Sequence, residues 1–310
     1  MSQNRTEWVI HIWGRKRNTL ELNDVEKFHL DVLRLLQSQH KKFDKILVNV
    51  ALDDDSDMGL FNLYKEKLGE VLMNDNVEFL HCQNDINKGE YVTFKPYVFD
   101  RIGEDVNIFY SHFKGYCSCV KLLRESYPIR IVDLCEKFWA YLMYQYSLNV
   151  DDVKKKLKNK CTYSWFVFKN SKEDETIKYF TDYHKCLQET DERFKDYVKD
   201  DLHKHTPGSF VWYNMKNIGE SLKDKHLITS VNPEYLNSIL KDKTSNLCTH
   251  FCELYLMQFL SEDECYSVND FNKEVSEINN SFYTLIYPSK KIGKEFIKDF
   301  EKYLIENELI

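Results

Sequence analysis

Short apolar runs alternate with amphipathic segments over residues 1–115, and this pattern constrains the fold of the 310-residue chain more than any other feature. The runs cover residues 8–13, 45–52, 77–81 and 106–111. Each is apolar at successive positions, which is typical of strands buried on both faces. A mostly parallel sheet with helices on both sides buries such strands, so the sequence predicts an α/β, Rossmann-like fold.

The segments between these runs have the marks of helices. Asn23, followed by Glu26 three positions later, has the spacing of a capping box, and apolar residues then recur at helical intervals. Further helices are predicted over residues 60–72 and within 91–102. The four strands are therefore joined by helical connections, as a parallel arrangement requires.

The second half of the chain is more helical. Helices are predicted over residues 131–148 and 150–157, and strands within 163–168 and 205–215. Few glycines and prolines interrupt the chain, so long flexible linkers are not expected. A soft boundary near residue 270 separates a main domain, residues 1–270, from a helical C-terminal extension, residues 271–310, expected to pack on it.

Charge and cysteine content limit the partners and the cellular compartment that are expected for the protein. Acids and bases are interleaved with a net charge of −7, which predicts no nucleic-acid partner. No apolar run reaches the ~18 residues of a transmembrane helix, and the nine scattered cysteines with no signal-peptide pattern indicate a cytoplasmic protein with free thiols. The Cys117–Cys119 and Cys248–Cys252 groups lack C-x2-C spacing, which disfavours zinc. The amphipathic tail could lie weakly on a membrane, although packing on its own domain is favoured.

Polar residues follow the second and third predicted strands. Asp53 and Asp55 come directly after residues 45–52, and Asn84 follows the third strand. Ligands of such sheets bind at the carboxyl ends of the strands. Crowded acids repel one another unless a cation, a sugar hydroxyl or a base edge relieves them. The alternative is a solvated acidic turn in which Asp53 or Asp55 caps the next helix.

The fourth strand runs directly into His112, Lys114 and Gly115. Lys114 could neutralise a phosphate group, and Gly115 would let that group approach the backbone closely. His112 could donate to an oxygen atom or bind a metal, whereas the alternative is a structural histidine.

Two further groups lie in the second half. His205, Gly208, Ser209 and Trp212 could border a sugar site, or form a tight turn followed by a core tryptophan. Glu253 stands in an otherwise apolar helical stretch, where it is either partnered in a site or part of an exposed stripe.

The order of these elements resembles a glycosyltransferase of the GT-A type. "ILVNVALDDDSD" at 46–57 resembles the acidic end of its second strand, and "QNDINKGE" at 83–90 its Asn-containing turn. A poorly characterised subgroup with YxHxKG and HxxGNFWW motifs is more similar still. This chain has "YSHFKG" at 110–115, "FWAYLMYQY" at 138–146 and "HTPGSFVW" at 205–212. The similarity spans about residues 8–260, with Ser209 and Val211 departing from the subgroup pattern.

The resemblance implies a GT-A-like fold and a hexosyl- or related transferase. Such an enzyme moves a sugar from a nucleotide-sugar donor to a hydroxyl of a glycan, lipid or protein acceptor. The residues implied in donor binding are Asp53, Asp55, Asn84, Lys114 and Gly115. Those implied on the sugar or acceptor side are His205, Gly208, Ser209 and Trp212. Catalysis falls to His112, beside Lys114 at the diphosphate, and to Glu253 as the base if the reaction inverts configuration.

Three points stay open at this stage. The expected DXD motif is missing, so no metal ligand is assigned, and a divalent Mn or Mg remains a possible cofactor. The fold could instead belong to a non-catalytic protein that binds a glycan or a partner. A nucleotidyltransferase is a third reading, although its glycine-rich loop is not found in "HIWGRKRNTLEL".

Overall fold

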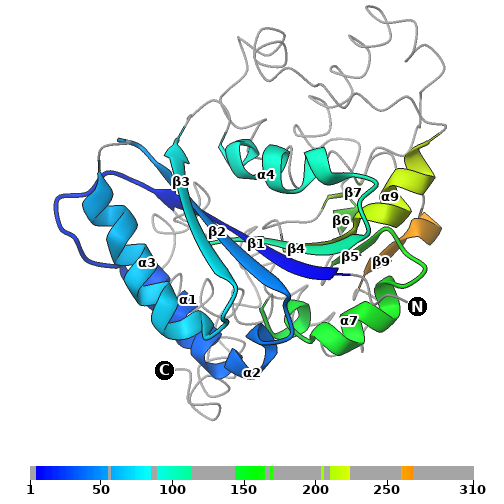
Figure 1. Ribbon diagram of the computed structural model, residues 1–310, viewed down its shortest axis with the longest axis horizontal. Coiled ribbons are helices and arrows are strands. Elements are labelled where there is room, and N and C mark those ends of the chain that lie inside the picture. The colour runs from blue at the N-terminus through cyan, green and yellow to red at the C-terminus, as the bar shows by residue number, and fades with distance from the viewer. Residues whose placement is uncertain are drawn as a thin grey trace, which may run out of the picture.

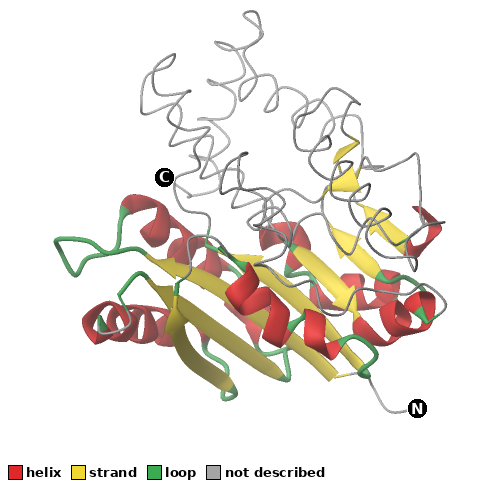
Figure 2. Cartoon of the chain, turned by 90° about the horizontal axis from the view of Figure 1, so that it is seen from above, coloured by secondary structure: helices red, strands yellow, loops and turns green. Residues whose placement is uncertain are grey.

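The computed structural model describes residues 5–54, 57–84, 89–113, 144–164, 168–169, 204–205, 210–223, 260 and 262–267. These residues form a seven-stranded sheet with the order β3-β2-β1-β4-β8-β5-β9, covered by helices on both faces (Figures 1 and 2). The α/β class and the mostly parallel sheet predicted from the sequence are confirmed.

Four parallel strands make the first half of the sheet: β1 (Arg5–Gly14), β2 (Lys45–Leu52), β3 (Val77–Gln83) and β4 (Val106–His112). The sheet becomes mixed at β8 (Val211–Asn214), which runs antiparallel to both β4 and β5 (Thr162–Ser164). β9 (Cys265–Ser267) pairs parallel with β5, and β6 (Phe168–Lys169) forms a separate ribbon with β7 (Lys204–His205).

The helices divide between the two faces of the sheet (Figure 1). One face packs against α1 (Asp24–Leu35), α2 (Gln37–His40), α3 (Met58–Leu72) and α7 (Val150–Leu157). The other packs against α4 (Tyr91–Tyr97), the short 3-10 helix η1 (Phe99–Arg101) and α9 (Met215–Leu222). A second 3-10 helix, η3 (Glu262–Glu264), precedes β9. Below, "the α4 face" means the second of these two faces.

Alternation along the strands explains the two cores. Trp8, Ile10 and Ile12 of β1 belong to the cluster under α1 and α3, whereas Val9 belongs to the cluster under α4. Because successive strand residues point to opposite faces, both sets are buried. The uninterrupted apolar runs of the sequence are thus the consequence of two covering layers.

Helix starts test two sequence predictions. Asn23 and Glu26 form the predicted capping box at α1, with each side chain bonded to the backbone of the other. The cap of α3 is Asp57, whose side chain accepts from the Leu60 N–H. The alternative that Asp53 caps this helix is wrong, because its carboxylate is engaged elsewhere.

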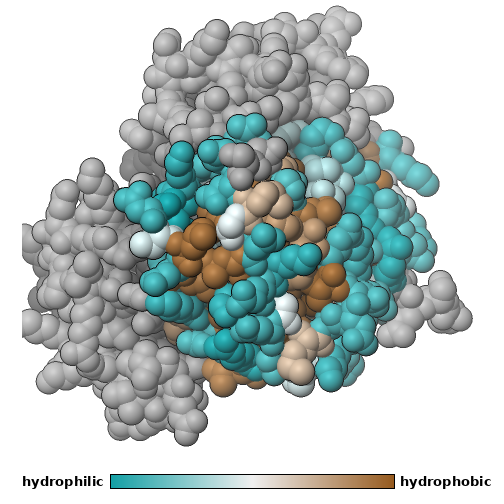
Figure 3. Space-filling model, turned by 60° about the vertical axis from the view of Figure 1, so that its left-hand side comes forward, coloured by the Kyte–Doolittle hydropathy of each residue, from teal (hydrophilic) through white to brown (hydrophobic). Residues whose placement is uncertain are grey.

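The outer strand β3 is covered less than its neighbours. Its side chains are half-buried or exposed, whereas β4 is buried along its whole length. Figure 3 shows apolar surface among hydrophilic residues on the side of the molecule where α3 and β3 lie. No helix among the described residues is long and apolar enough to cross a membrane.

One sequence prediction of the second half needs revision, and another is not tested. The strand expected within residues 205–215 ends at Asn214, and Met215 begins the unpredicted helix α9. The Asn214 side chain accepts from the Asn217 N–H and so makes a helix start there. The proposed extension, residues 271–310, lies outside the described residues.

Candidate functional site

The carboxyl end of the sheet has a buried polar row on its α4 face. His11 of β1 is in register with Asn49 of β2 on one side and with His112 of β4 on the other. Thr93 of α4 covers the row: its Oγ1 lies 2.7 Å from His11 Nδ1 and accepts from Asn49 Nδ2 at 2.7 Å. All four residues are buried, so this part of the sheet interior is polar where its neighbours are apolar.

The row continues into a carboxylate. Glu90 directly precedes α4, after Gly89, whose φ of +49° is the left-handed conformation that glycine adopts readily. The hydroxyl of Tyr110 donates to Glu90 Oε2 at 3.2 Å. Nδ1 of His112 is buried and meets Glu90 Oε1 in an ion-pair contact, without the alignment of a hydrogen bond. One buried carboxylate therefore joins the start of α4 to two residues of β4.

Burial also sets the charge state of His11. Desolvation lowers its pKa to about 4, which outweighs the attraction of Glu90, while His112 lowers the pKa further. The His11 ring is therefore neutral near pH 7, although it lies beside His112 and near the Glu90 carboxylate.

Asp53 organises the exposed rim next to this row. Its carboxylate accepts from Trp13 Nε1 at 2.8 Å, Asn84 Nδ2 at 2.8 Å and the Lys16 N–H at 3.1 Å. Burial opposes ionisation of Asp53, but the donated hydrogen bonds prevail and lower its pKa. The ends of β1, β2 and β3 are thus tied together through one carboxylate.

The loop after β1 adds cations to this rim. The guanidinium of Arg15 lies 4.2 Å from the centroid of the Trp13 ring, a cation–π arrangement. The ammonium of Lys16 lies 3.8 Å from Asp54 Oδ2, and both side chains are largely exposed. The rim accordingly presents positive charge beside the Asp53 carboxylate.

Three of the residues predicted from the sequence lie at this edge: Asp53, Asn84 and His112. Trp13 lies two residues beyond His11 and therefore on the same face, which links the rim to the buried row. For His205, only its backbone in β7 is described. Outside the described residues lie Asp55, Lys114, Gly115, Gly208, Ser209 and Glu253.

Trp212 lies in the core of the opposite face. Its side chain is fully buried, stacks on Phe109 with ring centroids 5.2 Å apart, and donates to the Ser147 carbonyl at 2.8 Å. This position matches the core alternative stated for Trp212, and we do not carry it into the proposed sugar site.

Sequence reasoning missed His11, Glu90 and Thr93. A histidine inside an apolar strand was one available signal, because a buried imidazole needs a partner. Glu90 was hidden because its role depends on contact with β4, twenty residues away in the chain.

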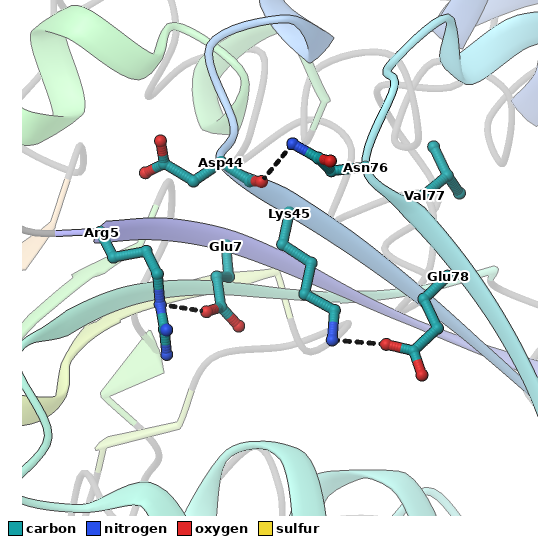
Figure 4. Close-up of a pocket in the computed structure, with 7 residues that line it drawn as sticks. All are labelled: Arg5, Glu7, Asp44, Lys45, Asn76, Val77 and Glu78. Carbon is teal, nitrogen blue, oxygen red and sulfur yellow. Dashed lines mark hydrogen bonds and ion pairs between the residues drawn. The ribbon is translucent and has the colours of Figure 1, made fainter.

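A pocket of about 470 Å³ lies at the opposite, amino end of the same face (Figure 4). It is lined by Arg5, Glu7, Asp44, Lys45, Asn76, Val77 and Glu78. Its charges are paired internally: Arg5 with Glu7 at 2.5 Å, and Lys45 with Glu78. Arg101 adds a second partner to Glu7 at 2.6 Å. Because these charged side chains neutralise one another, the carboxyl edge is the better candidate site.

Comparison with known proteins adds no family assignment: no protein-family model matches this chain, and no curated protein matches it either. The arrangement of residues at the carboxyl edge is therefore the basis for a functional conclusion.

Proposed function

We propose that the protein is a glycosyltransferase that binds a nucleotide-sugar donor at the carboxyl edge of its sheet. One observation supports this most strongly. Side chains from four separate chain segments lie next to one another there. His112 is in register with His11 on the neighbouring strand, and the Asp53 carboxylate accepts hydrogen bonds from both Trp13 and Asn84. Ligands of open α/β sheets bind at this edge, and the resemblance of the sequence to GT-A enzymes concerns the same segments.

The rim is the proposed nucleotide side. Asp53 and Asp55 would face the ribose or base, with Asn84 beside them. The Asp53 carboxylate has three internal donors and room for a fourth, because two ionised oxygens have about four acceptor positions in all. Its tied loops would meet the nucleotide already ordered, which lowers the entropy cost of binding.

Lys114 and His112 are the proposed diphosphate side. Lys114 would offset the charge that develops on the nucleoside diphosphate as it leaves, with Gly115 permitting close approach. Such electrostatic stabilisation commonly contributes about 3 kcal/mol. A divalent cation, Mn or Mg, could share this role. Within the described ranges, no group of three or more metal-binding side chains is found.

The acceptor side rests on the sequence. His205, Gly208 and Ser209 stay predictions for the sugar or acceptor, and Glu253 stays a prediction for the base of an inverting reaction. The described residues bring together a different proton acceptor, which is argued in the next section.

A thermal-shift screen with nucleotides and nucleotide sugars, with and without Mn, tests the proposal. A ligand at 100 times its Kd stabilises the folded state by about 2.7 kcal/mol, so the cognate donor should raise the melting temperature by several degrees. Lys114→Ala should abolish this shift and the transfer activity at nearly unchanged melting temperature. Lys65→Ala, an exposed lysine on α3, is the matched control and should behave as wild type.

The second candidate is a non-catalytic protein of the same fold that binds a glycan or a partner. The internal hydrogen bonds of Asp53 favour it, because a carboxylate that ties loops together need not contact a ligand. No shift with any nucleotide, in the presence of a shift with free glycans, would establish this candidate and remove the first.

A further inference from the structure

The position of Glu90 requires explanation. Only 6% of this residue is exposed, and its carboxylate lies between α4 and β4. Burying a carboxylate costs several kcal/mol unless hydrogen-bond donors or a cation accompany it. Its partners therefore show what the buried charge is for.

Two partners of the Glu90 carboxylate come from one strand. Tyr110 and His112 are two residues apart on β4, so their side chains point to the same face, and each meets a different oxygen of Glu90. The carboxylate consequently determines which way the His112 ring faces. With Nδ1 against Glu90, Nε2 is the nitrogen left for a ligand, and the described part of the chain places no hydrogen-bond partner on it.

The second imidazole cannot take this role. His11 is 4% exposed, and its Nδ1 lies against Thr93 rather than against a carboxylate. A proton added to His11 would have no adjacent counter-charge in contact, and burial holds its pKa at about 4. Cys82 also lies near the row, and its sulfur accepts from Asn49 Nδ2 at 3.3 Å. Of the two rings, His112 alone touches a carboxylate.

We infer that His112 is the general base of the reaction and that Glu90 is its positioning residue, an inference that rests on the proposed glycosyltransferase function. The acceptor hydroxyl attacks the anomeric carbon of the donor and its proton passes to His112 Nε2. The bond between that carbon and the diphosphate oxygen breaks, and the electron pair leaves on the nucleoside diphosphate. Glu90 offsets the imidazolium charge, as a carboxylate does behind a catalytic histidine.

The contacts also distinguish this role from a purely structural one. A purely structural carboxylate is stabilised by each additional hydrogen-bond donor. Glu90 instead contacts a histidine whose second nitrogen, Nε2, has no hydrogen-bond partner among the described residues. The inference further differs from the sequence prediction, which gives the proton to Glu253. The two bases can be separated by substitution.

The first test reads the ring itself and needs no activity. Nitrogen-15 NMR of the full chain, with the His112 signal identified by its loss in His112→Gln, reports which nitrogen has the proton in the neutral ring. We expect the Nδ1–H form in wild type and a mixture of both forms in Glu90→Gln, with exposed His81 as an internal reference. An Nε2–H ring in wild type, or a spectrum unaffected by Glu90→Gln, would overturn the inference.

The second test reads turnover. Glu90→Gln should lower kcat about 100-fold with the KM for the donor little changed, because the substitution alters proton transfer and not donor binding. Glu90→Asp should recover part of this loss. Glu70→Gln, an exposed carboxylate of α3, is the matched control.

The outcomes separate the inference from the proposed function. Donor binding and full turnover in Glu90→Gln or His112→Gln, with turnover lost in Glu253→Gln, would overturn the inference and leave the transferase standing. Absence of any nucleotide effect on the wild type would remove the transferase and with it the catalytic role of His112. Lost turnover with retained donor binding in both Glu90→Gln and His112→Gln supports both.

Discussion

Two buried clusters in this protein contain the same kinds of side chain but differ in their hydrogen bonding. Each contains a glutamate, a tyrosine and a basic side chain, and each connects a loop at the carboxyl edge of the sheet to a neighbouring element. The loop cluster consists of Arg17, Glu26 and Tyr64, and the site cluster consists of Glu90, Tyr110 and His112.

The loop cluster is saturated. Arg17 binds Glu26 through two parallel hydrogen bonds of 2.8 Å, Tyr64 donates to the same carboxylate at 2.5 Å, and the Asn23 N–H donates at 2.9 Å. Burial opposes ionisation of Glu26, but these donors lower its pKa. Arg17 also bonds the Tyr64 hydroxyl and the Glu21 carbonyl. This network holds the loop after β1 in place and leaves nothing for a ligand.

The site cluster differs in its basic side chain, and the difference teaches how a buried charge can serve stability or chemistry. Glu90 meets the Tyr110 phenol at 3.2 Å and the His112 imidazole, whose Nε2 has no hydrogen-bond partner within the described part of the chain. A satisfied network rigidifies the structure, whereas an incomplete one retains reactive capacity at a cost in stability. We therefore expect the loop cluster to dominate stability and the site cluster to dominate activity.

The largest effect is expected at the loop cluster. Arg17→Met should lower the free energy of unfolding by about 4 kcal/mol, because it leaves the buried Glu26 without its counter-charge. Urea unfolding followed by circular dichroism measures this loss.

The control for Arg17→Met is Arg34→Met. Arg34 also pairs with a carboxylate, Asp31 at 2.8 Å, but both side chains are about half exposed or more. Exposed pairs contribute about 0.5 kcal/mol. Similar losses in the two variants would contradict the assignment of the loop cluster as a stabilising network.

The second effect is a difference in pH dependence between the two regions. The folded-state pKa of His11 is about 4, below its ordinary value of 6.5, so the unfolded chain binds more protons between these values. Stability should be complete above pH 6.5 and fall as the pH drops towards 4, by up to about 3 kcal/mol. The lowered pKa of Glu26 acts in a separate window, with its contribution lost only as the pH falls below 4.5.

Unfolding titrations at several pH values check this separation. His11→Gln should flatten the slope between pH 6.5 and 4 by about 1.4 kcal/mol per pH unit, the value for one proton. His40, also buried with a pKa lowered to about 4 by desolvation, supplies a remaining slope in the same window. An unchanged slope in His11→Gln would show that His11 is not buried as a neutral imidazole.

The smallest effect compares the two tyrosines. Tyr64→Phe removes a short bond to a charged carboxylate and should cost about 2 kcal/mol, whereas Tyr110→Phe removes a longer one and should cost about 1 kcal/mol. Thermal unfolding of both variants measures the difference. The order of turnover should be reversed, with Tyr110→Phe the more impaired, and equal turnover would remove Tyr110 from the site.

Much of the first half of the fold could be predicted because its signals are local. The capping box at Asn23 and Glu26 concerns residues three apart, and β2 was predicted with the bounds that the structure has. A parallel sheet followed from strands without alternation.

The failures all involve distant contacts. Trp212 was assigned to a sugar site on the basis of its neighbours in sequence, yet it faces Phe109 and Ser147 in the core. The alternative of a helix cap at Asp53 is likewise wrong, since Asp57 fills the cap while Asp53 is bonded to Trp13 and Asn84. The roles of residues of the same type within one stretch could not be distinguished from the sequence alone, because only tertiary contacts give them different roles.

The sequence by itself determined the class of the fold, the four parallel strands and the edge at which polar side chains gather, since hydrophobic periodicity and capping are properties of neighbouring residues. Only the tertiary structure decided that Asp53 ties the rim together, that His11 is neutral and that Glu90 meets His112. Burial and charge pairing decided these points, and both arise when segments far apart in the chain are packed into one layer.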